Sequence, residues 1–135
     1  MGRQAQLSKE IAVTVANKVG VLADMSKLLS EGGINIEAVA GYAVGNEAKV
    51  MVVTGNNAAA VEILKKAGYA SLKENEVVMV ELENKPGALK EITMSLEGNG
   101  VDIKQVYGTA CSSGCPSRLV FSTSDNQKAL EALKK

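Results

Sequence analysis

Apolar and small or polar residues alternate along two stretches of the chain, residues 11–16 and 77–83, as they do in half-buried β-strands. Each stretch leads into a short turn that begins Asn-Lys, and then into apolar residues at helical spacing. Glycines at 32–33 and at 98 and 100 mark the ends of these helices. The pattern therefore predicts two strand–turn–helix segments with the same internal order.

The first half of the chain continues with four more predicted elements. They are two strands, a helix and a short strand, over residues 34–44, 48–55, 58–68 and 69–74. The order βαββαβ predicts an α+β fold, with a small antiparallel sheet and two helices on one face. The second half repeats this order as far as a helix over 125–135 and lacks the fourth strand. The N-terminal segment, another chain, or a truncation of the sequence would each account for the sheet edge that this leaves.

The two halves align under one offset of 67 residues (84 − 17), which pairs Asn17 with Asn84. Other pairs under this offset are Gly20 with Gly87, Leu29 with Leu96, Gly33 with Gly100, Gly41 with Gly108, Val53 with Val120 and Ile63 with Leu130. Chance similarity would not keep one offset through strands, helices and turns, so the chain is a tandem duplication with units at 1–75 and 76–135. A unit of this size buries only about 60% of its unfolded surface, so pairing within and between chains, as in a homodimer, is expected.

The turns NKVGVL (17–22) and NKPGAL (84–89) are the candidate ligand sites. The first N–H groups of a helix lack internal partners and lie at the positive end of its dipole, so a carboxylate can bind there without lysine or arginine. Gly20 lets a ligand approach the backbone, Asn17 offers a donor and an acceptor, and the Asn35 carbonyl is a candidate acceptor for an ammonium group. The alternative is that Asn, Gly and Pro86 serve only to turn the chain and cap the helices.

These turns, each followed by a helix and then by GGINI or GNGVDI, resemble the ACT domain. The resemblance covers nearly the whole chain and implies two ferredoxin-like βαββαβ sandwiches in tandem, the second without its last strand. ACT domains typically bind amino acids and regulate metabolic enzymes or transcription. The resemblance implies a site between two paired units, at the strand–helix turn and the start of the second strand. The implied ligand-binding residues are Asn17, Val19, Gly20, Val21, Leu22, Asn35 and Ile36 in the first copy, and Asn84, Gly87, Ala88, Leu89, Asp102 and Ile103 in the second.

The second copy departs from the first because Asp102 stands where the first has Asn35. A carboxylate there favours a ligand ammonium and repels a ligand carboxylate, so the two sites are not expected to be equivalent. Because the resemblance accounts for nearly all of the 135 residues, neither an enzyme domain nor a DNA-binding domain is expected beside the ACT-like units. We therefore expect a sensor of a free amino acid that modulates a metabolic enzyme, another regulator, or its own assembly. The alternative is a structural dimerisation module that binds no ligand.

Composition narrows the remaining function classes. Lys+Arg and Asp+Glu number 15 each, and the chain has one Phe, three Tyr and no Trp, so neither a basic face nor base-stacking aromatics indicate nucleic-acid binding. There is no His and no evident nucleophile–base set, so neither an enzyme nor a cofactor is expected. No apolar run approaches the roughly 20 residues that cross a bilayer, and the N-terminus lacks a signal-peptide core. A cytoplasmic protein without membrane partners is expected.

The two cysteines, Cys111 and Cys115, lie in the predicted turn between the second and third strands of the second copy. Their spacing differs from the C-x-x-C redox motif, and no His or further Cys completes a zinc site. The ends of such a hairpin can approach closely enough for a disulfide, but two free thiols are expected in a cytoplasmic protein. Neither a metal site nor a redox role is expected.

Overall fold

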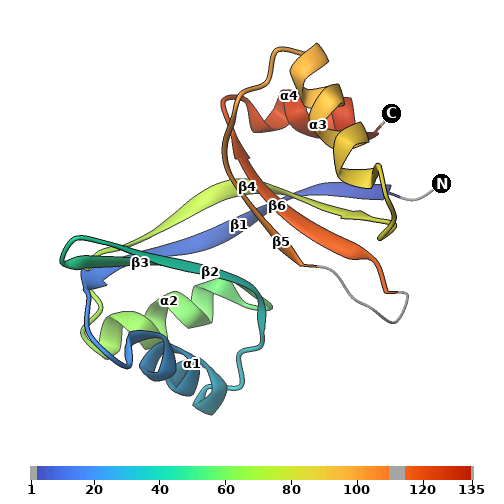
Figure 1. Cartoon of the computed structure of the whole chain (residues 1–135). Coiled ribbons are helices and arrows are strands. Elements are labelled where there is room, and N and C mark those ends of the chain that lie inside the picture. The colour runs from blue at the N-terminus through green and yellow to red at the C-terminus, as the bar shows by residue number, and fades with distance from the viewer. Residues whose placement is uncertain (1–2, 110–114, 135) are drawn as a thin grey trace. The chain divides into compact units, whose positions relative to one another are not determined.

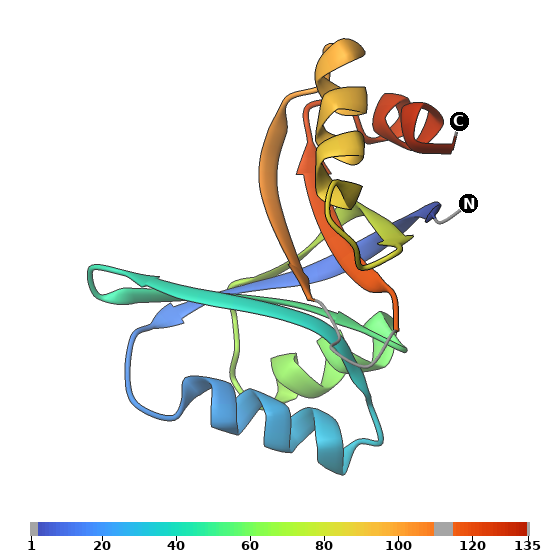
Figure 2. The ribbon, with the colours of Figure 1, turned by 45° about the vertical axis from the view of Figure 1, so that its right-hand side comes forward.

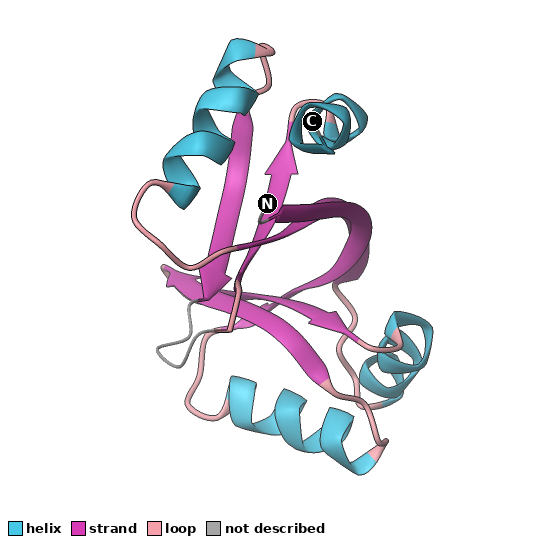
Figure 3. Cartoon of the chain, turned by 90° about the vertical axis from the view of Figure 1, so that its right-hand side faces the viewer, coloured by secondary structure: helices cyan, strands magenta, loops and turns pink. Residues whose placement is uncertain are grey.

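A computed structural model describes residues 3–109 and 115–134 of the chain (Figure 1). In chain order its elements are β1 Arg3–Ala16, α1 Val21–Glu31, β2 Ile36–Val44, β3 Glu47–Thr54, α2 Asn57–Lys66, β4 Leu72–Leu82, α3 Ala88–Gly98, β5 Ile103–Thr109, β6 Ser117–Thr123 and α4 Asn126–Lys134. Figure 3 shows these helices and strands by type. The predicted ferredoxin-like order of elements in each half is confirmed.

The chain folds into two compact units, and their boundary differs from the predicted one at the N-terminus. One unit is Lys9–Asn75, hereafter the first unit. The second unit joins residues 3–8 to the chain from Glu76 onward, so residues 3–8 do not belong with the remainder of 1–75. The physical reason is strand length: β1 has 14 residues and β4 has 11, against about 5–6 in a typical strand. Each of these strands therefore contributes one segment to each unit.

Four strands make the sheet of each unit, within the overall order β2-β3-β1-β4-β6-β5. In the first unit β3 pairs antiparallel with both β1 and β2, and the N–H of Thr14 donates to the carbonyl of Ser71 just before β4, at 3.0 Å. In the second unit β6 pairs antiparallel with β4 and β5, and residues 3–8 of β1 supply the fourth strand. Of the three explanations for the missing strand, the structure therefore selects the N-terminal segment.

The offset between the two copies changes between their second and third strands. Ile11 pairs with Val52 in the first unit, whereas its counterpart Val78 pairs with Phe121 in the second, an offset of 69 (121 − 52). The offset of 67 holds through the second strand only, and the expected matches of Val53 with Val120 and Ile63 with Leu130 are wrong. The chain from Ile103 in β5 to Phe121 in β6 is two residues longer (18 − 16) than its counterpart from Ile36 in β2 to Val52 in β3. Surface connections tolerate such insertions at little free-energy cost.

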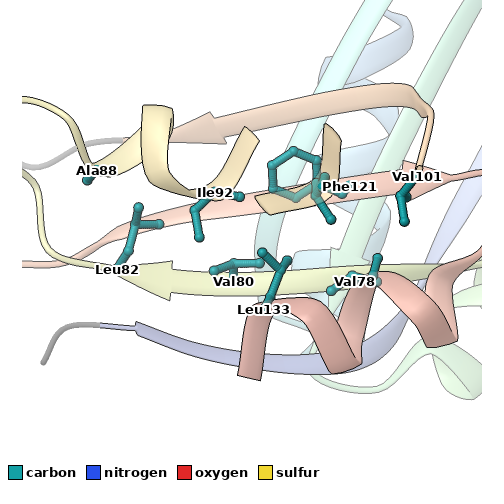
Figure 4. Packing of buried hydrophobic residues seen from close by; sticks show 10 residues of the cluster. Val78, Val80, Leu82, Ala88, Ile92, Val101, Phe121 and Leu133 are labelled. Carbon is teal, nitrogen blue, oxygen red and sulfur yellow. The ribbon is translucent and has the colours of Figure 1, made fainter. Parts of the chain in front are cut away.

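Each unit has its own hydrophobic core between the sheet and its two helices. In the first unit, α1 and α2 lie on one face of the sheet (Figure 2), and the buried cluster comprises Ile11, Val13, Val21, Met25, Leu29, Val50, Val52, Ala60 and Leu64. In the second unit, Val80 of β4 and Phe121 of β6 pack with Ile92 of α3 and Leu133 of α4 (Figure 4). Ala5 packs against this second core, which shows that the N-terminal strand contributes to it. Alternate residues of β1, Ile11 and Val13, lie in the first core, as the pattern of residues 11–16 predicted. In β4 the four consecutive residues Val77 to Val80 are all buried, so the prediction of a half-buried strand over residues 77–83 is wrong there.

Candidate functional site

The turn between β1 and α1, residues 17–20, is hereafter the first elbow. Gly20 is the N-cap residue of α1 and has φ 95°, in the left-handed region that residues with a Cβ rarely adopt. A Cβ added at Gly20 would meet nothing within 4 Å. The glycine is therefore required by the backbone conformation of the turn, and the space beside the backbone is open rather than filled by the chain.

The helix that follows Gly20 presents backbone donors. The carbonyl of Gly20 accepts from the N–H of Asp24 at 2.9 Å, which is the first hydrogen bond of α1. No side chain caps this helix start. Within residues 3–109 and 115–134, no acceptor reaches the N–H groups of Val21, Leu22 and Ala23. These groups carry the partial positive charge of the helix terminus and can receive a carboxylate.

The first elbow carries the exposed side chains of Asn17, Lys18 and Val19 and leads into the apolar residues Val21 and Leu22. Val21 is buried and anchors the helix start in the core, whereas Val19 is fully exposed and the side chain of Leu22 is 49% exposed. Asn17 is exposed, and its N–H donates to the carbonyl of Asn46 at 2.7 Å, which ties the elbow to the β2–β3 turn. The predicted residues of the elbow therefore lie together at one end of the first unit.

Asn35 and Ile36, the remaining predicted residues of the first copy, lie at the other end of that unit. Both β1 and β2 run antiparallel to β3, and Glu47 pairs with Ala16 and with Val44. The elbow therefore adjoins the end of β2, while Asn35 precedes its start. The nine residues of β2 span about 30 Å. One unit alone does not bring Asn35 to the elbow.

The backbone of Asn35 also has a partner within the unit. Its carbonyl accepts from the N–H of Gly55 at 3.1 Å. The expected acceptor for a ligand ammonium thus already holds one hydrogen bond, although a carbonyl oxygen has a second lone pair. Ile36 is partly buried against the first core and serves packing at this position.

The second elbow, residues 84–87, has the same backbone turn but offers fewer donors. Gly87 has φ 89° and open space where a Cβ would lie. The N–H of Ala88 donates to the carbonyl of Lys85 at 3.2 Å, so the first donor of α3 is engaged. The ammonium of Lys85 lies 3.5 Å from a carboxylate oxygen of Glu83. Leu89 is exposed, as its counterpart Leu22 is.

Asp102 and Ile103 occupy the start of β5, as the sequence alignment of the copies predicted. The N–H of Asp102 donates to Oγ of Ser124 at 3.0 Å, and its carbonyl accepts from the N–H of Ser124 at 2.9 Å. Ile103 packs against the second core, and the Asp102 residue is exposed. Because the N–H of Ala88 is engaged, the second elbow differs chemically from the first, while Asp102, like Asn35, lies at the opposite end of its unit from the elbow.

A contact that the sequence analysis missed joins the first turn of α1 to the segment after α2. The hydroxyl of Tyr69 donates to Oδ2 of Asp24 at 2.5 Å. Burial of the phenol, followed by the hydrogen bond to Asp24 and the negative charge of that residue, raises the pKa of Tyr69 from 10.0 to about 12. The two residues are 45 positions apart, and no local pattern in the sequence connects them.

The cysteine prediction requires correction. Cys115 is disulfide-bonded, so the expectation of two free thiols is wrong, while Cys111 lies outside the described residues. Strands β5 and β6 pair at Thr109 and Arg118, and this pairing holds the two ends of the connection close together, which favours closure of a disulfide.

Two further properties concern the described residues as a whole. They contain no group of three or more His, Cys, Asp or Glu side chains that could hold a metal ion. None of the helices found there has the length and apolar character needed to cross a membrane.

Comparison with known proteins identifies the family. Residues 6–135 match the family model described as an ACT domain pair. The chain therefore belongs to the ACT domain pair family, which confirms the resemblance inferred from the two Asn-Lys turns. No protein with a curated description matches the chain.

Solved structures share the fold over the full length of the chain. Protein BT0572 from Bacteroides thetaiotaomicron is 25% identical, with a TM-score of 0.88, and the match covers 96% of this chain and 88% of that one. The ligand-free regulatory subunit of aspartate kinase from Thermus thermophilus is 16% identical, with a TM-score of 0.70 over 99% of this chain and 95% of that one. The structure of aspartokinase alpha and beta subunits is 18% identical, with a TM-score of 0.68 and coverage of 98% and 95%. At these last two identities the likeness concerns the fold.

Proposed function

We propose that this ACT domain pair is a regulatory module that binds a free amino acid at the first elbow. The observation that carries the proposal is the open turn at Gly20, which is followed by three backbone N–H groups without acceptors in the described chain. The ligand carboxylate accepts from these groups, and the exposed amide of Asn17 in the same turn offers a further donor and acceptor. The proposal includes no catalytic step.

A second copy of the chain completes the site in this proposal. Strand β2 is the edge strand of the sheet in the first unit. Its exposed side chains include Val39, Tyr42 and Val44, and Glu37 is the one charged residue of the strand. Such an apolar end strand is suited to pairing with another strand. Antiparallel pairing of β2 with its copy about a two-fold axis would set the start of one strand beside the end of the other. Asn35 of the second copy would then adjoin the first elbow and could accept from the ligand ammonium.

The output of the module is regulation of a metabolic enzyme or of another regulator. The fold of the chain is that of the regulatory subunit of an aspartate kinase over nearly the full length of both chains, which supports a regulatory role without catalysis. A ligand that binds between two copies favours the paired state, so amino-acid concentration would control assembly as well as partner binding.

A thermal-shift screen of the twenty free amino acids tests the proposal. At a concentration of about 100 times Kd, a ligand adds about 2.7 kcal/mol to the free energy of unfolding, which is well within detection. At least one amino acid is expected to raise the melting temperature, and Asn17→Ala is expected to reduce this rise while the protein stays folded. If none of the twenty changes the melting temperature, the proposal is wrong.

In an alternative to two equivalent sites, the second unit has only a structural role and its elbow binds no ligand. The hydrogen bond from Ala88 to Lys85 and the ion pair of Lys85 with Glu83 favour a second elbow that binds no ligand. If only the first elbow binds a ligand, each protomer would bind one amino acid. Two molecules per protomer, measured by titration calorimetry, would show instead that both elbows bind.

A further inference from the structure

We propose that Tyr69 is a positioning residue of the first elbow, whose phenol holds the Asp24 carboxylate away from the N–H groups that receive the ligand. This inference rests on the proposed function and concerns the regulation of the same site. Tyr69 does not touch the ligand in this proposal. Its effect is to keep an acidic side chain of the protein from competing with the ligand carboxylate.

Asp24 is placed where it can compete. It lies in the first turn of α1, four residues after the N-cap Gly20, and its own N–H forms the first hydrogen bond of the helix. Acidic side chains near a helix start can fold back by three residues to accept a backbone N–H, as in a capping box. The N–H three residues before Asp24 is that of Val21. A self-capping Asp24 would take this donor and place a negative charge beside the remaining two.

Tyr69 is held firmly enough to prevent this. Gly68 has φ 101° and reverses the chain after α2, and the N–H of Tyr69 donates to the carbonyl of Leu64 at 3.1 Å. The ring of Tyr69 packs against the core of the first unit. The phenol is thus fixed at its base, and its hydroxyl forms a charge-assisted hydrogen bond with Oδ2 of Asp24 at 2.5 Å. With a pKa near 12, Tyr69 remains a donor at neutral pH.

The acidic residue at the start of α3 in the second copy lacks the contact that Asp24 makes in the first, within the described residues. Glu91 is the counterpart of Asp24, and its N–H likewise donates to the carbonyl of the N-cap glycine, Gly87, at 3.0 Å. No hydroxyl in the described part of the chain bonds to the Glu91 side chain. The Tyr69–Asp24 hydrogen bond therefore accompanies the elbow whose donors are open, whereas at the second elbow Ala88 is already hydrogen-bonded to Lys85.

A double-mutant cycle on the full chain tests this role. The probe is the amino acid that gives the largest rise in melting temperature in the screen, and its Kd is measured by titration calorimetry. Tyr69→Phe is expected to weaken binding roughly fivefold, the effect of about one modest hydrogen bond. Asp24→Asn alone is expected to leave Kd within about twofold or to tighten binding, since it removes the competing charge. The double variant is expected to bind as Asp24→Asn does, because Tyr69 has no carboxylate left to restrain.

The outcomes separate this inference from the function on which it rests. An unchanged Kd in Tyr69→Phe, or an equal loss in the Asp24→Asn background, would overturn the positioning role while leaving amino-acid binding intact. If Tyr69→Phe does not fold, Asp24→Asn alone decides: a strong loss of affinity would show that the carboxylate assists the ligand, contrary to the inference. If no amino acid binds the wild-type chain, the proposed function fails, and the inference fails with it.

Discussion

The substitution Gly20→Ala separates the conformational requirement at the first elbow from its proposed contact with a ligand. An L-residue at φ 95° costs about 1–2 kcal/mol, and the reduced freedom of the unfolded chain returns about 0.4–1 kcal/mol. Because an added Cβ meets nothing within 4 Å, no steric clash adds to this sum. We expect a net loss of about 1 kcal/mol of stability, and a melting temperature lower by about 3–6 °C.

A matched control is available in the second unit. Gly100 has φ 71° and is likewise open where a Cβ would lie, so Gly100→Ala carries a similar strain without altering the first elbow. Both variants are expected to melt below the wild type by similar amounts in a calorimetric scan without ligand. This comparison establishes that any difference between them in binding does not come from lost stability.

The two variants should differ in affinity for the amino acid found in the screen. The methyl group of Gly20→Ala would occupy the space through which a carboxylate approaches the N–H groups of Leu22 and Ala23. Loss of one hydrogen bond to a charged group corresponds to about 1.5–3 kcal/mol, or at least a tenfold higher Kd. Gly100→Ala should bind as the wild type does. Equal affinities for all three proteins would refute the argument that the open space at Gly20 is where the ligand binds.

Three further predictions concern the shared strands and the Tyr69 contact. Ala5→Asp places a carboxylate against the second core and should lower the free energy of unfolding, measured in urea, by about 2–4 kcal/mol. Gln4→Asp changes an exposed residue and should alter this free energy by less than about 0.5 kcal/mol. Equal effects would contradict the assignment of residues 3–8 to the second unit. Glu10 is 2% exposed and accepts from the Asn75 amide at 3.2 Å, so Glu10→Ala should cost about 2–3 kcal/mol by the same measurement, against almost nothing for the exposed Glu37→Ala. The raised pKa of Tyr69 means that the folded state keeps a proton that the unfolded state releases above pH 10; its stabilisation is therefore complete below pH 10 and lost between pH 10 and about 12. The stability difference between wild type and Tyr69→Phe should shrink over that interval, and a constant difference would show that the phenol does not titrate there.

The proposed regulatory role depends on a geometric relation between Asn17 and Asn35. The sequence suggested that the two residues could hold the two ends of one amino acid. The shared pairing of Ala16 and Val44 with Glu47 shows that they lie at opposite ends of β2. A site built from both residues therefore requires the first unit of another copy of the chain, and dimerisation and ligand binding would be coupled by necessity.

The amino-acid sequence alone determined the secondary-structure elements and the turns of this protein. The spacing of apolar residues defined the strands and helices, and the glycines at 20 and 87 defined both elbows, because a left-handed turn favours glycine whatever surrounds it. The duplication could also be recognised from the sequence, since each copy repeats the same turns. These features depend on neighbours within a few residues of one another along the chain.

Only the tertiary structure decided which segments meet. It placed residues 3–8 in the sheet of the second unit, shifted the offset of the copies to 69 after β5, and brought Tyr69 to Asp24. Strand partners some 70 residues apart leave no mark on local periodicity, because backbone hydrogen bonds between strands are nearly indifferent to which side chains flank them. The choice between partners rests on how completely each sheet edge and core face is covered, and that is a property of the folded chain as a whole.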